Sequence, residues 1–69
     1  MGIKIIVNGE VWEFGGATLS ELLLERGLTP DQGGLAVAIN GSIALRSEWS
    51  EITILPSDNV EIIHIVRGG

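Results

Sequence analysis

The residues with the clearest potential for chemistry stand at the end of the sequence, where "HIVRGG" spans His64 to Gly69. Because glycine has no side chain, Gly68 and Gly69 can enter a channel too narrow for any other residue. They also leave the terminal carboxylate sterically free. A carboxylate is a poor electrophile at neutral pH, and turning it into a reactive acyl group requires ATP and adenylation. We therefore interpret the ending as a slim arm with an activatable tip.

A simpler interpretation is a frayed terminus that happens to be glycine, since chain ends are commonly poorly ordered. Against it, an apolar strand-like stretch runs directly into Arg67, Gly68 and Gly69. That continuity favours a functional arm. His64 lies between two isoleucines of the same stretch. We interpret it as a strand histidine near the sheet edge, with its ring packed and one nitrogen in contact with solvent, rather than as a catalytic base.

The rest of the chain offers little for catalysis. It contains one histidine and no cysteine, so it has no thiolate, no disulfide and no metal-ligand spacing. A serine–histidine–carboxylate arrangement is recognised by geometry rather than by sequence, but one helix leaves little room for a pocket that excludes water. Gly15-Gly16 before a helix lacks the spacing and the lysine of a phosphate loop. We read it as the turn that enters the helix.

Composition narrows the class of protein. The chain has 69 residues, 45% of them hydrophobic, and a net charge of −5. This size and hydrophobicity predict one packed domain. The acidic balance argues against nucleic acid as a partner and favours a basic protein. Apolar runs are too short to span a bilayer and no signal peptide is visible, so we expect a cytoplasmic protein.

The first half of the chain predicts a hairpin and a helix. Ile3 to Val7 and Val11 to Phe14 are strand-like, and Asn8-Gly9 between them suits a tight turn. A helix is expected from about Leu19 to Arg26, with Thr18 and Glu21 spaced as a capping box. Leu19, Leu22 and Leu23 form its apolar stripe, and Gly27 ends it.

The second half predicts a second hairpin and a final strand. Leu35 to Ile39 is a strand with two alanines on one face, and Asn40-Gly41 turns it into a short strand, "SIAL". A helical turn is expected near Arg46 to Trp49, with Trp49 capping the core, as Trp12 does elsewhere. After this turn, three apolar residues should pack back into the core: Ile52, Ile54 and Leu55. The last strand is expected to cover residues 60–66.

These elements can bury their apolar faces only as a mixed sheet of four or five strands packed on one helix. We expect the last strand to lie in the middle of the sheet, beside the first. This is an α+β fold of the β-grasp, ubiquitin-like type, comprising residues 1–66, followed by a flexible Arg-Gly-Gly tail at 67–69. Because this fold hosts several functions, the function must be argued from a site.

One face of the predicted sheet is left without a helix. On the last strand, Val60 and Ile62 can face the helix, so Ile63 and Ile65 point the other way. Beside Ala36 and Ala38 they would form a flat apolar patch, which commonly marks a protein interface. Alternatively, a second small core that includes Ile6 takes them up.

The chain resembles the sulfur carrier proteins of thiamine biosynthesis, the ThiS family, over nearly its whole length. The matching stretches are "IIVNGE", "TLSELL", "LAVAINGSIALRSEW" and "DNVEIIHIVRGG", of which the third is the most specific. Two positions depart from the family pattern. Ser57-Asp58 stands where Gly-Asp is usual, which should alter only the turn, and Arg67 stands where small or apolar residues are frequent.

The resemblance implies a protein co-substrate that is not itself an enzyme and binds no cofactor. An activating enzyme would use ATP to adenylate Gly69, sulfur from a donor protein would replace the adenylate to give a thiocarboxylate, and thiazole synthase would receive that sulfur. Arg67, Gly68 and Gly69 would enter the partner's active site. Ala36, Ala38, Ile63 and Ile65 fall where the partner-facing surface would be, on a carrier that is monomeric when free.

Three other functions stay open. The same chemistry could supply sulfur to molybdopterin or another metabolite, although those carriers tend to be longer around the helix. A ubiquitin-like modifier would instead become linked to lysines, and Arg67-Gly68-Gly69 is similar to the ending of ubiquitin. A structural β-grasp module with an inert tail would need no activation at all.

Overall fold

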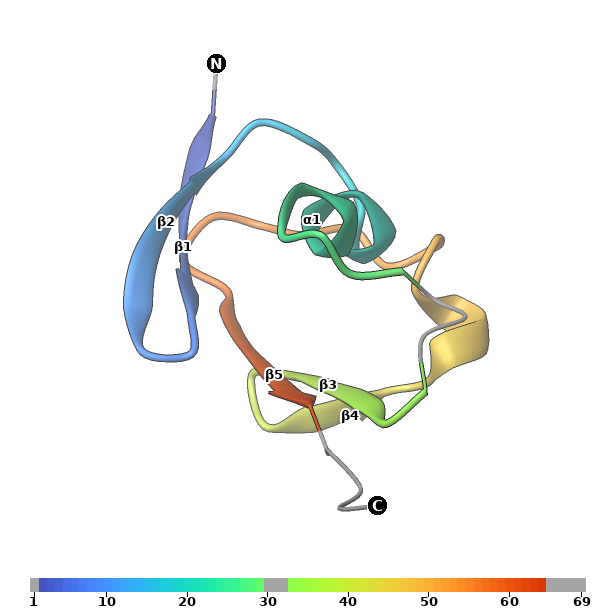
Figure 1. Ribbon diagram of the computed structural model, residues 1–69. Helices are drawn as coiled ribbons and strands as arrows, with labels where there is room; N and C mark the ends of the chain where they lie inside the picture. Colours follow the sequence, from blue (N-terminus) through green and yellow to red (C-terminus); the bar gives the residue numbers. More distant parts are fainter. Residues whose placement is uncertain (1, 30–32, 65–69) are drawn as a thin grey trace.

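A computed structural model describes residues 2–29 and 33–64, and its elements follow the predicted order (Figure 1). Both hairpins, the helix, the helical turn and the last strand are confirmed. The elements are β1 (Ile3–Val7), β2 (Glu10–Phe14), α1 (Leu19–Glu25), β3 (Leu35–Ile39), β4 (Ser42–Ala44), a 3₁₀ turn (Arg46–Glu48) and β5 (Asn59–His64).

The strands form one mixed sheet in the order β2-β1-β5-β3-β4. Both hairpins are antiparallel, and β5 lies between them, antiparallel to β3 and parallel to β1. The sheet curves around α1, which covers one face only (Figure 1). This is the predicted β-grasp architecture, with the last strand beside the first.

Each hairpin turns on an Asn-Gly pair in the left-handed region. The φ angles are 50° and 82° at Asn8 and Gly9, and 51° and 85° at Asn40 and Gly41. Two consecutive positive φ angles are the signature of the type I′ turn, whose twist matches the twist of the two strands it joins. The two dipeptides therefore set the register of both hairpins.

The helix begins with the predicted capping box. The Thr18 side chain accepts a hydrogen bond from the Glu21 N–H, and the Glu21 carboxylate accepts one from the Thr18 N–H. At the other end, α1 stops at Glu25 with Arg26 as its C-cap, and Gly27 has a φ of 79°. The expected end at Arg26 differs by one residue, which is within the usual fraying of helix ends.

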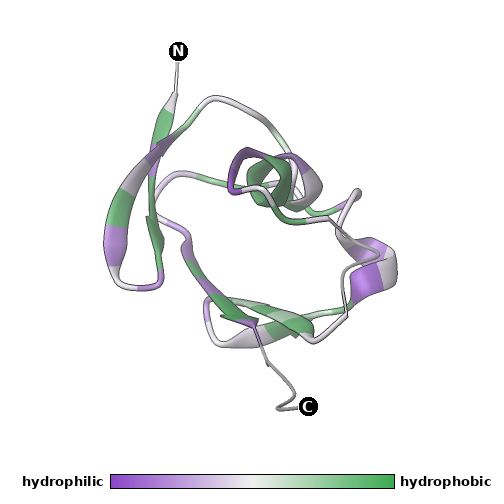
Figure 2. Cartoon of the chain, in the orientation of Figure 1, coloured by the Kyte–Doolittle hydropathy of each residue, from purple (hydrophilic) through white to green (hydrophobic). Residues whose placement is uncertain are grey.

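The core lies between α1 and the covered face of the sheet, where apolar residues of the strands gather (Figure 2). Trp49 is buried and closes one end, as predicted, and Trp12 packs partly buried against the same core. The fully or nearly fully buried residues are Ile5, Val7, Phe14, Leu19, Leu22, Leu23, Leu35, Val37, Ala44, Trp49, Ile54 and Val60.

One core prediction is wrong. Ile54 is buried and Ile52 packs against the core, but Leu55 is 57% exposed. In an extended segment alternate side chains point the same way, so Ile52 and Ile54 face inward and Leu55 faces out. The predicted boundary between 66 and 67, and the predicted flexibility of 67–69, lie outside the described residues.

Candidate functional site

The face of the sheet opposite α1 brings together the predicted surface residues of β3 and β5. Ala36 pairs with Ile63 and Ala38 with Glu61, so all four side chains share this uncovered side. Ile63 is 53% exposed, and the two alanines are partly exposed. The structure thus confirms that Ala36, Ala38 and Ile63 lie together, whereas Ile65 is outside the described residues.

Three further apolar residues belong to this side. The register places Val11 opposite Ile6, and Ile43 opposite Ala38. Val11 and Ile43 are 70% and 71% exposed, and the sequence prediction missed both as surface residues. Their alternation with inward residues in the two hairpins was the signal that could have found them. We call this set the open face: Ile6, Val11, Ala36, Ala38, Ile43 and Ile63.

The alternative of a second small core is not supported by the described residues. Ile6 is 36% exposed, and Ile63 is more exposed than that. Side chains in a core would lose nearly all their contact with water. The open face is therefore an accessible apolar surface, of the kind that marks interaction sites.

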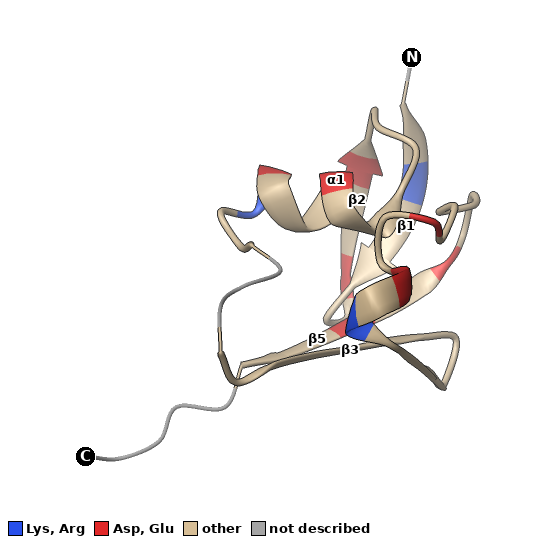
Figure 3. Cartoon of the chain, turned by 90° about the vertical axis from the view of Figure 1, so that its right-hand side faces the viewer, with Lys and Arg blue, Asp and Glu red and all other residues tan. Residues whose placement is uncertain are grey.

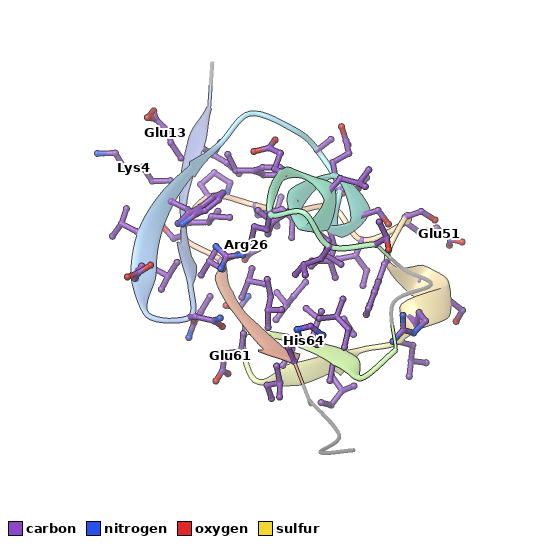
Figure 4. All side chains as sticks on the ribbon, viewed as in Figure 1. Lys4, Glu13, Arg26, Glu51, Glu61 and His64 are labelled. Atoms are coloured by element: carbon purple, nitrogen blue, oxygen red, sulfur yellow. The ribbon has the colours of Figure 1, made fainter. Side chains whose placement is uncertain are left out.

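Charged side chains border the open face. Lys4 and Glu13 pair in the register on the β1–β2 side, where Figure 4 shows both on the outer side of the hairpin. Glu61 lies in β5 next to Ala38, and its side chain points away from α1 (Figure 4). Further acidic residues lie on the far side of α1 from the sheet (Figure 3). The border is thus mixed, within an acidic molecule.

The C-terminal end of β5 is braced by residues of the stretch most specific to the resemblance. Leu35 pairs with His64, and the Arg46 guanidinium donates a hydrogen bond of 3.0 Å to the Leu35 carbonyl. That guanidinium lies 4.8 Å from the centre of the Trp49 ring, within the range of a cation–π contact. The buried Trp49 indole in turn donates to the Ala44 carbonyl at 2.9 Å. These contacts give the Arg and Trp a structural role.

The start of β5 is fixed by the turn at Ser57-Asp58. The Asp58 carboxylate accepts hydrogen bonds from the Leu55 N–H at 2.8 Å and from the Asn40 side chain at 3.0 Å. Ser57 has a φ of 70°, in the left-handed region that glycine adopts readily and that is strained for serine. After this turn, β5 begins at Asn59 and pairs with β1 and β3.

His64 is exposed, so the prediction of a packed ring is wrong. It has the same parity as Val60 and Ile62 and is the last residue of β5, opposite Leu35, with its side chain drawn on the α1 side of the strand (Figure 4). No group of three or more potential metal ligands occurs among residues 2–29 and 33–64. No pocket opens in the surface of that part of the chain.

The predicted reactive residues, Arg67, Gly68 and Gly69, lie outside the described residues. They follow His64, which ends a strand held between two others. The described fold thus places the last described residue before them, His64, on the central strand, next to Ile63 of the open face. Within the same residues, no helix is both long and apolar enough to span a membrane.

A mixed five-stranded sheet around one helix, with a central final strand and an uncovered apolar face, defines a β-grasp protein of the ubiquitin-like class. The model of the ThiS family matches residues 5–69, and the chain belongs to this family. Members of the family are sulfur carriers of thiamine biosynthesis and are not enzymes.

Solved structures agree with this assignment. The crystal structure of the thiamine biosynthesis protein ThiS from Geobacter metallireducens is 26% identical, with a TM-score of 0.78 over 97% of this chain and 100% of that one. The solution structure of a thiamine biosynthesis protein from the same organism is also 26% identical, with a TM-score of 0.76 over 97% of this chain and 88% of that one. No curated protein sequence matches the chain.

Proposed function

We propose that this protein carries sulfur for the thiazole ring of thiamine as a thiocarboxylate on Gly69. The observation that carries the proposal is the family match, which extends through Gly69. It is supported by the position of β5, a central strand from which the chain continues to Arg67, Gly68 and Gly69.

The chemistry follows from the carboxylate. A Gly69 oxygen attacks the α-phosphorus of ATP in the activating enzyme and expels pyrophosphate, which leaves an acyl adenylate. A persulfide sulfur of a donor protein then attacks the acyl carbon, the bond to the phosphate oxygen breaks, and AMP leaves. A thiol then attacks the donor's sulfur in the acyl disulfide so formed and, as the reductant, breaks the S–S bond and releases the carrier. The product is a thiocarboxylate, from which thiazole synthase takes the sulfur. ATP and catalysis belong to the partners, and this protein is their co-substrate.

Each part of the fold has a role in this proposal. Arg67, Gly68 and Gly69 enter the active site of the partner, where the absence of side chains at the two glycines lets them pass a narrow channel. The open face, together with Ile65, supplies the apolar surface on which the activating enzyme and thiazole synthase dock. The net charge of −5 assists encounter with a basic partner.

The proposal is tested by the intact mass of the protein after incubation with an activating enzyme, ATP and a sulfur donor. We expect the exchange of one oxygen for sulfur, confined to the C-terminal peptide. Gly68→Val, or one residue added after Gly69, should abolish the exchange while circular dichroism stays unchanged. Gly33→Ala is the control, because a Cβ there would meet nothing within 4 Å. Exchange in either tail variant would contradict the narrow-channel proposal.

A ubiquitin-like modifier is the second candidate, favoured by the Arg-Gly-Gly ending. It shares the adenylation step but ends in an isopeptide bond to lysine, with loss of AMP and no sulfur. An epitope-tagged chain expressed in cells distinguishes the two. Ladders of covalent adducts that survive reducing denaturation would show a modifier, whereas a carrier gives only the free protein.

A further inference from the structure

The two Asn-Gly turns hold opposite ends of β5 in the same way. The Asn40 N–H donates to the Asn59 carbonyl at 2.8 Å, and its side-chain oxygen accepts from the Asn59 N–H at 2.9 Å. The Asn8 N–H donates to the Val60 carbonyl at 2.9 Å, and its side-chain oxygen accepts from the Ile62 N–H at 2.7 Å. Asn40 thus forms hydrogen bonds with the first residue of β5, and Asn8 forms them with residues nearer the end of the strand.

Asn8 extends the parallel pairing of β5 beyond the point where β1 ends. The register of β1 with β5 stops at Val7 and Val60, because the chain turns back at Asn8 and Gly9. The Asn8 amide also donates to the Ile62 carbonyl at 3.2 Å. A side-chain amide carries the same donor and acceptor as a peptide unit, so Asn8 replaces the strand residue that β1 lacks.

The turn itself does not require this side chain. Glycine adopts the left-handed conformation of a type I′ turn as readily as asparagine. On the other side of β5, Asn40 at the end of β3 forms a hydrogen-bonded pair with Asn59. In an antiparallel ladder, hydrogen-bonded and non-hydrogen-bonded pairs alternate, so Ile62 and its partner Val37 form a non-hydrogen-bonded pair. The backbone groups of Ile62 therefore point away from β3, and Asn8 is the partner that holds them.

We propose that Asn8 is a positioning residue for the C-terminal arm. Its amide keeps β5 paired on both sides as far as Ile62, two residues before the last described residue, and so fixes the position from which residues 65–69 continue. This inference rests on the proposed function, because placing the Gly69 carboxylate against ATP requires a defined root. Errors of about 1 Å in the placement of reacting groups lower rates by up to about a hundredfold.

The test compares Asn8→Gly with Asn40→Gly as a matched control. Both substitutions keep a turn that glycine favours, and both remove one side chain that bonds β5. In Asn8→Gly, the Ile62 N–H should exchange with solvent about tenfold faster, and kcat/KM for adenylation by the activating enzyme should fall about tenfold. Asn40→Gly should leave both quantities close to the wild-type values, although its stability falls similarly.

A second variant covers the possibility that Asn8→Gly does not fold. Asn8→Asp keeps an oxygen for the Ile62 N–H but places a carboxylate oxygen against the Ile62 carbonyl, so we expect the same loss in kcat/KM. Equal losses in the Asn8 and Asn40 variants, or wild-type kinetics in the Asn8 variants, would overturn the positioning role. If the wild-type protein is not adenylated at all, the proposed function has failed, which is a separate and recognisable outcome.

Discussion

At the scale of single residues, Glu21 is held in its charged form by the start of α1. Its carboxylate accepts hydrogen bonds from the Ala17 N–H at 3.1 Å, the Thr18 N–H at 3.1 Å and the Thr18 hydroxyl at 3.2 Å. The bonds from the Thr18 and Ala17 backbone, followed by the hydroxyl, lower the pKa of Glu21 from its ordinary value of 4.5. Bonds that favour the charged form always act in this direction.

This pKa shift predicts how stability depends on pH. A carboxyl group with a lowered pKa in the folded state stabilises that state above the unfolded pKa, and the contribution disappears as the pH falls through the folded value. Glu21→Gln should therefore lose stability near neutral pH and show a smaller decline between neutral and acidic pH. Urea denaturation across this range measures the effect. Glu25→Gln is the matched control on the same helix, because it leaves the capping box intact.

Ser57 is a second residue whose backbone allows a prediction. Its φ of 70° lies in the left-handed region, which is strained for a residue with a side chain. Ser57→Gly should raise the free energy of unfolding by about 0.5–1 kcal/mol, since relief of the left-handed strain exceeds the entropy cost of glycine. Thermal unfolding measures it. An unchanged or lower melting temperature would mean that the serine side chain stabilises the turn.

At the scale of elements, the turn between β2 and α1 depends on close packing at one glycine. A Cβ on Gly16 would lie 2.7 Å from the Phe14 ring, whereas a Cβ on Gly15 would meet nothing within 4 Å. Phe14 is buried in the core and has little freedom to move. Gly16→Ala should cost about 1–3 kcal/mol of stability, and Gly15→Ala close to none, as measured by urea denaturation. If the two substitutions cost the same stability, the turn would require glycine for its backbone conformation and not for the contact with Phe14.

The elements themselves could be predicted because their signals are local. The Asn8-Gly9 turn and the Thr18–Glu21 capping box act within four residues, so the sequence shows them directly. The central place of β5 followed from the need to bury strands against one helix. The exposure of Leu55 and His64 could not be predicted, because it depends on the extent of the core, which is set by tertiary packing and not by local sequence. Likewise, the bonds from Asn8 to Ile62 join residues 54 positions apart.

At the scale of the whole molecule, the fold separates two surfaces. One is the open face, which includes Ile63 of β5, and the other is the outer side of α1, which carries acidic residues (Figure 3). We compare one exposed aliphatic residue from each surface: Ile63 on the open face, which is 53% exposed, and Leu24 on α1, which is 59% exposed. The exposed fraction of these side chains therefore does not show which surface binds the partner. Their position does, because only Ile63 lies on β5.

This separation predicts opposite outcomes for the same change on the two surfaces. Ile63→Gln should raise the KM for activation about tenfold, because the core of an interface concentrates the binding energy in a few apolar residues. Its kcat should stay unchanged, since Gly69 still reaches the active site once the carrier is bound. Leu24→Gln should leave both constants unaltered. Steady-state kinetics with the carrier as varied substrate measures this, after urea denaturation has shown that both variants are folded. If Leu24→Gln raises the KM and Ile63→Gln does not, the partner binds the helical side.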